Sequence, residues 1–176
     1  MHLTSEPSKK NIIEAHERIE KYIHKTPILS SQLIDKICGA NIYFKCENFQ
    51  KTGAFKFRGA SNAILSLSEK ELSSGIATHS SGNHAAAIAL AGRMHKTTAY
   101  IVMPSNAPKI KIAAVREYGG KITFCKPTLK SREETLDKIV KQTGAAFIHP
   151  YNNYDVIAGQ ASCAKEILQE LDNLDY

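Results

Sequence analysis

The chain has 176 residues and a formal charge of +6, with 43% hydrophobic residues, 23% charged residues and four cysteines. This length supports one core or slightly more, and the composition is that of a soluble globular protein with no membrane-spanning run. Scattered basic residues argue against a nucleic-acid partner, and the N-terminus lacks the apolar stretch of a secretory signal, so we expect a cytoplasmic protein with reduced thiols and no membrane partner.

The first 74 residues predict helices and a single strand. Ser8 can cap a helix to about Tyr22, and Gly39 ends a short helix that begins near Ser31. Residues 41–47 have the pattern of a strand, and residues 58–67 that of a helix. Ser68-Glu69-Lys70-Glu71 has the spacing of a capping box.

From residue 75 onward, strand and helix signals alternate. Strands are predicted at residues 75–79, 99–103, 121–125 and 145–149, and helices at residues 85–95 and 109–118, from Ser131 to Gly144, and from a cap at Asp155 to about Leu171. This order predicts an α/β fold with an open, mostly parallel, twisted sheet. We expect three parts, at residues 1–74, 75–149 and 150–176, of which the middle one is a small α/β domain.

The segment Lys-Thr-Gly-Ala-Phe-Lys-Phe-Arg-Gly at residues 51–59 contains the first candidate for chemistry. Lys56 stands between two phenylalanines and follows small residues, which let the backbone and a flat ring approach closely. A partly desolvated lysine loses affinity for its proton and becomes a nucleophilic amine, as a Schiff-base lysine requires. The alternative is a surface lysine at a helix start. Lys51 and Arg58 are rivals that we expect to be solvated or pairing charges.

The loop Ser80-Ser81-Gly82-Asn83-His84 is the second candidate. It follows a strand and precedes a helix, where backbone N–H groups and the helix dipole suit a carboxylate or phosphate. Asn83 could donate to a ring hydroxyl or satisfy its own turn. The alternative for the loop is a plain helix cap made by Ser80 or Ser81. Together the two segments indicate a pyridoxal phosphate (PLP) site.

Other kinds of site find no support in the sequence. It contains no G-x-x-x-x-G-K-[ST], no G-x-G-x-x-G and no G-x-S-x-G motif. A stand-alone nucleotide-binding module is therefore a weak alternative. The seven histidines show no ligand spacing, so we expect no metal site within the chain.

Three segments resemble signatures of the fold type II PLP-dependent enzymes, most closely the serine racemase and threonine/serine dehydratase family. They are Lys51–Gly59, Ser80–His84 and Val156–Gln160. The resemblance covers all 176 residues, but only about the N-terminal half of such an enzyme. It implies that residues 75–149 are the small domain, and that residues 1–74 and 150–176 belong to the large domain.

The same resemblance implies roles for individual residues. Lys56 resembles the Schiff-base lysine, Phe55 the residue that lines the cofactor ring, and Asn83 the residue that bonds the pyridine 3-hydroxyl. Ser81, Gly82, Asn83 and His84 resemble the loop that holds the substrate carboxylate. Ser81 is the second serine found in racemases, so Lys56 and Ser81 would act as acid and base on opposite faces, with β-elimination from serine or threonine as an accompanying activity.

The resemblance also implies effectors and a homodimer. ATP would bind near Ser31, Gln32, Lys51 and Thr52, and Mg²⁺ would bind through residues beyond Tyr176. Tyr151 stands where relatives often have Asn or Phe, which leaves the substrate open. The glycine-rich phosphate loop, and a Ser or Cys facing the pyridine nitrogen, have no counterpart. We therefore expect the N-terminal half of a PLP-dependent serine racemase/dehydratase; the alternative is a non-catalytic truncated isoform that interacts with intact subunits.

Overall fold

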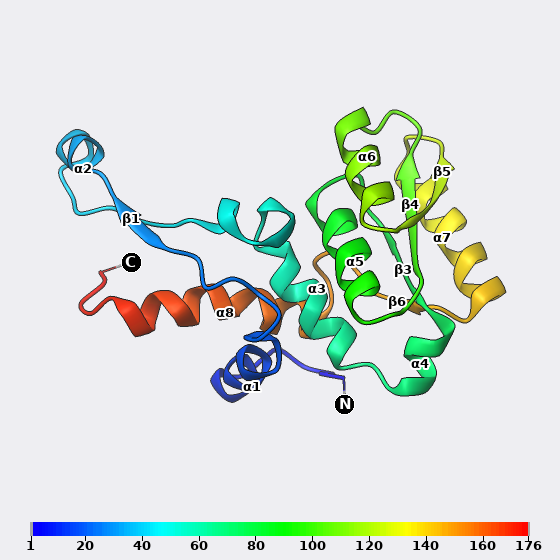
Figure 1. Ribbon diagram of the computed structural model, residues 1–176, viewed down its shortest axis with the longest axis horizontal. Helices are drawn as coiled ribbons and strands as arrows, with labels where there is room; N and C mark the ends of the chain where they lie inside the picture. The colour runs from blue at the N-terminus through cyan, green and yellow to red at the C-terminus, as the bar shows by residue number, and fades with distance from the viewer. Residues whose placement is uncertain (1, 176) are drawn as a thin grey trace.

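A four-stranded sheet has the order β5-β4-β3-β6, and every neighbouring pair in it is parallel. The computed structural model describes residues 2–175 and places this sheet in one of two lobes (Figure 1). Its strands are β3 (Ile76–His79), β4 (Ala99–Pro104), β5 (Lys121–Cys125) and β6 (Ala146–Phe147). The predicted α/β fold with an open parallel sheet is confirmed.

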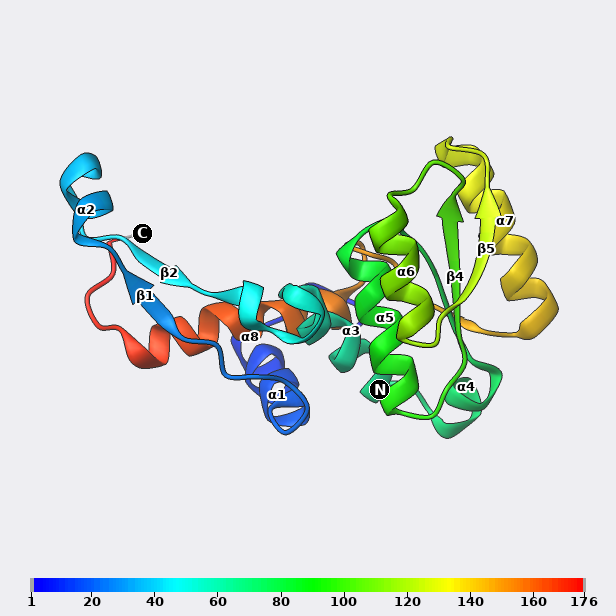
Figure 2. The ribbon, with the colours of Figure 1, turned by 45° about the horizontal axis from the view of Figure 1, so that its top comes forward.

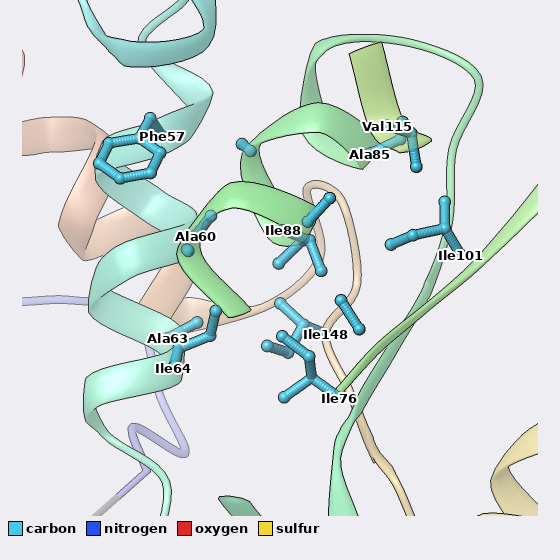
Figure 3. Packing of buried hydrophobic residues seen from close by; sticks show 14 of the residues in the cluster. Phe57, Ala60, Ala63, Ile64, Ile76, Ala85, Ile88, Ile101, Val115 and Ile148 are labelled. Carbon is cyan, nitrogen blue, oxygen red and sulfur yellow. The ribbon is translucent and has the colours of Figure 1, made fainter. Parts of the chain in front are cut away.

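Helices cover both faces of the sheet. They are α5 (Asn83–Met94), α6 (Lys109–Glu117) and α7 (Leu129–Thr143). Alternate strand residues point to opposite faces. Ile76 and Ile101 therefore pack with Ile88 of α5, as Figure 3 shows, while Ala77 and Val102 pack with Leu136 and other residues of α7. Apolar contacts on both faces explain why the inner strands β3 and β4 are buried.

Three helices form the centre of the second lobe. They are α1 (Lys9–Ile19), α3 (Lys56–Leu65) and α8 (Tyr154–Glu170). A short helix, α4 (Glu69–Ser74), leads from α3 to the sheet. Because α3 packs on both α8 and α5, it joins the two lobes (Figure 2).

An arm extends from the second lobe, away from the sheet (Figures 1 and 2). It contains the antiparallel strands β1 (Ile28–Ser30) and β2 (Tyr43–Lys45), with α2 (Gln32–Cys38) between them. Two 3-10 turns, η1 (Glu47–Phe49) and η2 (Lys51–Gly53), lead from β2 to α3. Several large apolar side chains of the arm face solvent, including Leu33 (69% exposed) and Ile37 (74%).

Two predicted helix caps are wrong. Thr128, not Ser131, caps α7, and its side chain accepts a hydrogen bond from the Ser131 N–H. Asn153, not Asp155, caps α8, and Asp155 is instead a buried first-turn residue. In each case the true cap lies two or three residues earlier, where the backbone is still extended.

Two strand predictions, one in the arm and one in the four-stranded sheet, are too long. The strand expected at residues 41–47 is only Tyr43–Lys45, and its partner β1 was not predicted. The strand expected at residues 145–149 is only Ala146–Phe147; beyond it Ile148 still donates to the Ala77 carbonyl, while the carbonyls of Ile148 and Pro150 face the site described below. No helix in the described chain is long and apolar enough to cross a membrane, and all four cysteines are free thiols.

Candidate active site

Lys56 is the first residue of α3, and its ammonium group points to the segment that follows β6. Its Nζ donates a hydrogen bond to the Pro150 carbonyl at 3.0 Å and lies 5.2 Å from the centroid of the Phe55 ring. Partial burial lowers the pKa of Lys56 below its ordinary value, because desolvation disfavours the charged amine. The side chain is therefore not that of a freely solvated surface lysine.

The rival cations near Lys56 have other partners. Arg58 is fully buried and donates to Glu47 and to Glu166, whose carboxylate also pairs with Lys45 Nζ at 2.8 Å. Lys51 Nζ lies 5.7 Å from the centroid of the Phe57 ring. Arg58 is thus a buried pairing charge that anchors α3 to η1 and α8, and Lys56 is the amine that faces the loop after β6.

The loop at residues 80–82 leaves the N-terminus of α5 without a side-chain cap. Gly82 occupies the cap position, and no side chain bonds the first-turn amides. The Ser80 hydroxyl accepts only from the Gly82 N–H, at 3.3 Å. A Cβ built on Gly82 meets no atom within 4 Å, so the space beside this residue is open. The plain helix cap weighed above is therefore absent, and the amides at the positive end of α5 are available to an anion.

His84 lies under this loop and is almost fully buried. Its Nε2 is 3.4 Å from the Ile148 carbonyl oxygen, and its Nδ1 is buried with no hydrogen-bond partner within residues 2–175. Burial, together with the nearby charge of Lys56, lowers the pKa of His84 to about 4, so the ring is neutral at pH 7. Because His84 contacts the Ile148 carbonyl and Lys56 the Pro150 carbonyl, the structure brings the two predicted segments together.

Asn83 is the first residue of α5, and its side chain is exposed. Its Oδ1 accepts a hydrogen bond from Lys111 Nζ at 2.7 Å. Sequence reasoning missed Lys111, which stands in the sequence as one of many scattered basic residues. No local signal marks Lys111, but the topology does: Lys111 lies in the first turn of α6, the helix that follows β4, and helices that follow neighbouring parallel strands begin at the same edge of the sheet.

The four residues predicted to bind ATP lie in two places. Ser31 and Gln32 begin α2 in the arm, whereas Lys51 and Thr52 form η2 beside α3. The two views show α2 at the far end of the arm, away from α3 (Figures 1 and 2). ATP binding stays a prediction. Among the described residues, no three His, Cys, Asp or Glu side chains are grouped so that they could hold a metal ion.

Comparisons with known proteins show the family of the chain. A family model described as pyridoxal-phosphate dependent enzyme matches residues 19–176. The chain is 49% identical to serine racemase from Dictyostelium discoideum over 166 residues, which are 94% of this chain and 51% of the relative. It is 48% identical to beta-hydroxyaspartate dehydratase from Paracoccus denitrificans over 96% of this chain and 54% of that protein.

A solved structure supports the same relationship. Maize serine racemase has a TM-score of 0.95 and 44% identity, over 97% of this chain and 52% of the maize chain. The chain therefore spans about half the length of the relatives that it matches.

Proposed function

The chain belongs to the family of pyridoxal-phosphate dependent enzymes, and from this premise we propose that it is part of a serine racemase with an accompanying β-elimination activity on serine and threonine. Its relatives include both a racemase and a dehydratase, which supports a racemase or lyase of small amino acids. The observation that carries the proposal is the half-buried Lys56 amine beside the uncapped N-terminus of α5.

The residues of the site fit the aldehyde and ring of PLP. Lys56 offers an amine with a lowered pKa, which suits covalent attachment to the aldehyde, and the neighbouring Phe55 offers an aromatic surface. When bound, PLP accepts the electron pair that remains after a proton leaves the substrate's Cα. Phe55, Lys56 and Asn83 of this chain would hold the cofactor.

The loop before α5 fits the substrate carboxylate. Its uncapped amides favour an anion, and the open space beside Gly82 lets a ligand approach the backbone closely. His84 lies buried below the loop, and its Nδ1 has no hydrogen-bond partner among the described residues. We assign Ser81, Gly82, Asn83 and His84 to substrate binding.

Racemisation needs a proton donor on one face of Cα and an acceptor on the other. We assign these roles to Lys56 and to the Ser81 hydroxyl, which makes no hydrogen bond to any described residue. When one group removes the Cα proton and the other delivers a proton to the opposite face, Cα is inverted, whereas departure of the substrate's β-hydroxyl after the Cα proton is removed gives elimination.

The test is covalent trapping on this chain. PLP is added, the adduct is reduced with borohydride, and the modified lysine is mapped by mass spectrometry. We expect a pyridoxyl group on Lys56 that is lost in Lys56→Ala and kept in Lys51→Ala, because Lys51 contacts Phe57 instead. Adducts spread over many lysines, or unchanged in Lys56→Ala, would overturn the assignment.

Activity then separates the reactions. D-serine formed from L-serine reports racemisation, and oxo acid reports elimination. Ser81→Ala should reduce racemisation far more than elimination, because only inversion needs a proton on the second face. Equal loss of both products would remove Ser81 from the acid–base role.

Further parts of the proposal rest on the family. We place residues 1–74 and 150–176 in a large domain and residues 75–149 in a small domain, because α8 returns to pack on α1 and α3. We also propose a cytoplasmic homodimer with ATP and Mg²⁺ as effectors. Lys51 and Thr52 support an ATP site through their position in η2, which packs against α5.

A second candidate function follows from the arm. Its exposed apolar side chains favour association with another polypeptide, as a truncated isoform that interacts with intact subunits would need. Leu33→Ser with Ile37→Ser should abolish such an association in analytical ultracentrifugation and leave trapping at Lys56 unchanged. A chain that traps PLP nowhere but still associates would favour this second function.

A further inference from the structure

A lysine from a neighbouring helix contacts the residue that we place beside the cofactor ring. Strands β3 and β4 pair in parallel, and α5 and α6 follow them, so both helices begin at the same edge of the sheet. Asn83 is the first residue of α5, and Lys111 lies in the first turn of α6. Lys111 Nζ donates to Asn83 Oδ1 at 2.7 Å.

This contact selects one of two orientations of the Asn83 amide. An asparagine side chain has an acceptor oxygen on one side and an NH₂ donor group on the other, whereas an ammonium group can only donate. With its oxygen held by Lys111, Asn83 must turn its NH₂ group away from α6. If the amide turned by half a turn, its NH₂ group would face the Lys111 ammonium. Two donor groups would then meet with no acceptor between them, which is unfavourable.

We propose that Lys111 is a positioning residue that orients the Asn83 amide so that its N–H groups face an oxygen acceptor of the ligand. This inference rests on the proposed function, in which that acceptor is the ring oxygen of PLP. A phenolic oxygen that carries negative charge is bound by N–H donors and repelled by a carbonyl oxygen. Lys111 also makes no ion pair with a carboxylate of residues 2–175, so its charge adds to the attraction for that oxygen.

The neighbouring Lys109 provides a matched control. It lies in the same helical turn, is exposed, and makes no hydrogen bond to Asn83. Lys111→Glu and Lys109→Glu change the net charge equally, but only the first puts an acceptor against the Asn83 amide and should reverse its orientation. Lys111→Arg keeps a donor-only group and should preserve the orientation.

The first measurement needs no cofactor. The side-chain NH₂ signals of Asn83 are followed by NMR in the full chain, with Asn83→Asp used for assignment. Lys111→Met and Lys111→Glu should shift these signals, while Lys109→Met, Lys109→Glu and Lys111→Arg should leave them in place. Signals that do not respond to Lys111→Glu, in a spectrum that is otherwise native, would overturn the inference.

The second measurement is the dissociation constant of PLP, together with the trapped adduct at Lys56. Lys111→Glu should bind PLP about tenfold more weakly than Lys109→Glu, since it loses one charge-assisted hydrogen bond to the ring oxygen. If both variants weakened PLP binding equally, Lys111 would act only through its charge, and its positioning role would be overturned. A wild-type chain that trapped no PLP at Lys56 would overturn the proposed function, and the Asn83 signals would still decide separately whether the contact orients the amide.

Discussion

Gly59 and Gly159 lie directly against each other where α3 crosses α8. A Cβ built on Gly159 would lie 2.9 Å from the Gly59 Cα, 2.6 Å from the Asn62 Cβ and 2.7 Å from the Arg58 carbonyl oxygen. Two of these neighbours are backbone atoms, which cannot move aside without separating the helices. The crossing therefore depends on hydrogen as the side chain at both positions.

Gly159→Ala should lower the free energy of unfolding by about 1–3 kcal/mol, because the added methyl group forces α3 and α8 apart. Urea unfolding followed by circular dichroism measures this change. Leu168→Ala is the control, since Leu168 is 70% exposed in the same helix α8 and its replacement should leave stability almost unchanged. Equal effects of the two substitutions would contradict the close crossing.

Removing the Glu166 carboxylate, which two buried cations share, should strongly lower the free energy of unfolding. Glu166 is bonded by Arg58 and Lys45, and the side chains of all three are at most 4% exposed. Glu166→Gln leaves two buried cations short of an anion, and we expect a loss of about 3–5 kcal/mol in the free energy of unfolding. Glu134→Gln, at an exposed pair with Lys130, should cost less than about 1 kcal/mol in the same urea titration.

His84 should make the fold sensitive to acid. Its pKa is about 4 in the folded chain and about 6.5 when unfolded, so between these values the unfolded chain binds more protons. Stability should therefore fall as pH drops from about 6.5 to 4, by a total of about 3 kcal/mol from this residue. His84→Gln should flatten this part of the pH–stability curve, and His24→Gln, at an exposed site, should not. A curve for His84→Gln that stayed parallel to the wild type would argue against a buried neutral ring.

Lys56 should react with acylating reagents at lower pH than exposed lysines. Burial lowers its pKa below the ordinary 10.5, so a larger fraction of neutral amine is present at any given pH. Brief acetylation at several pH values, read by mass spectrometry, gives the midpoint for each lysine. The midpoint of Lys56 should fall below that of Lys130, whose side chain is 86% exposed. Coincident midpoints would show that Lys56 is freely solvated.

Local sequence signals predicted the helix ends whose capping depends on residues close by in the chain. Ser68 and Glu71 form the expected capping box, and Gly39 and Gly144 end their helices in the left-handed conformation. The strand at residues 121–125 was placed correctly. The short strand β1 was missed because it is defined by pairing with β2 across an intervening helix, and such pairing leaves little trace in three residues.

Local sequence signals likewise predicted one part of the candidate site and missed another. Lys56 and the loop at residues 80–84 stand out in the sequence through their neighbours and spacing. The Pro150 carbonyl and Lys111 do not, because a backbone oxygen has no sequence signal and Lys111 is one of many basic residues. Their roles come from the sheet, which brings separate loops to one edge.

The ion pairs of Arg58 also constrain the order in which the chain can fold. Arg58 and Lys45 share Glu166, which lies 108 residues after Arg58. During synthesis the ribosome delivers the N-terminus first. Until α8 emerges, burial of these two cations would lack its main counter-charge, so the arm and α3 cannot reach their final packing. The sheet lobe between them can assemble earlier, and α8 then completes the packing of elements that were made long before it.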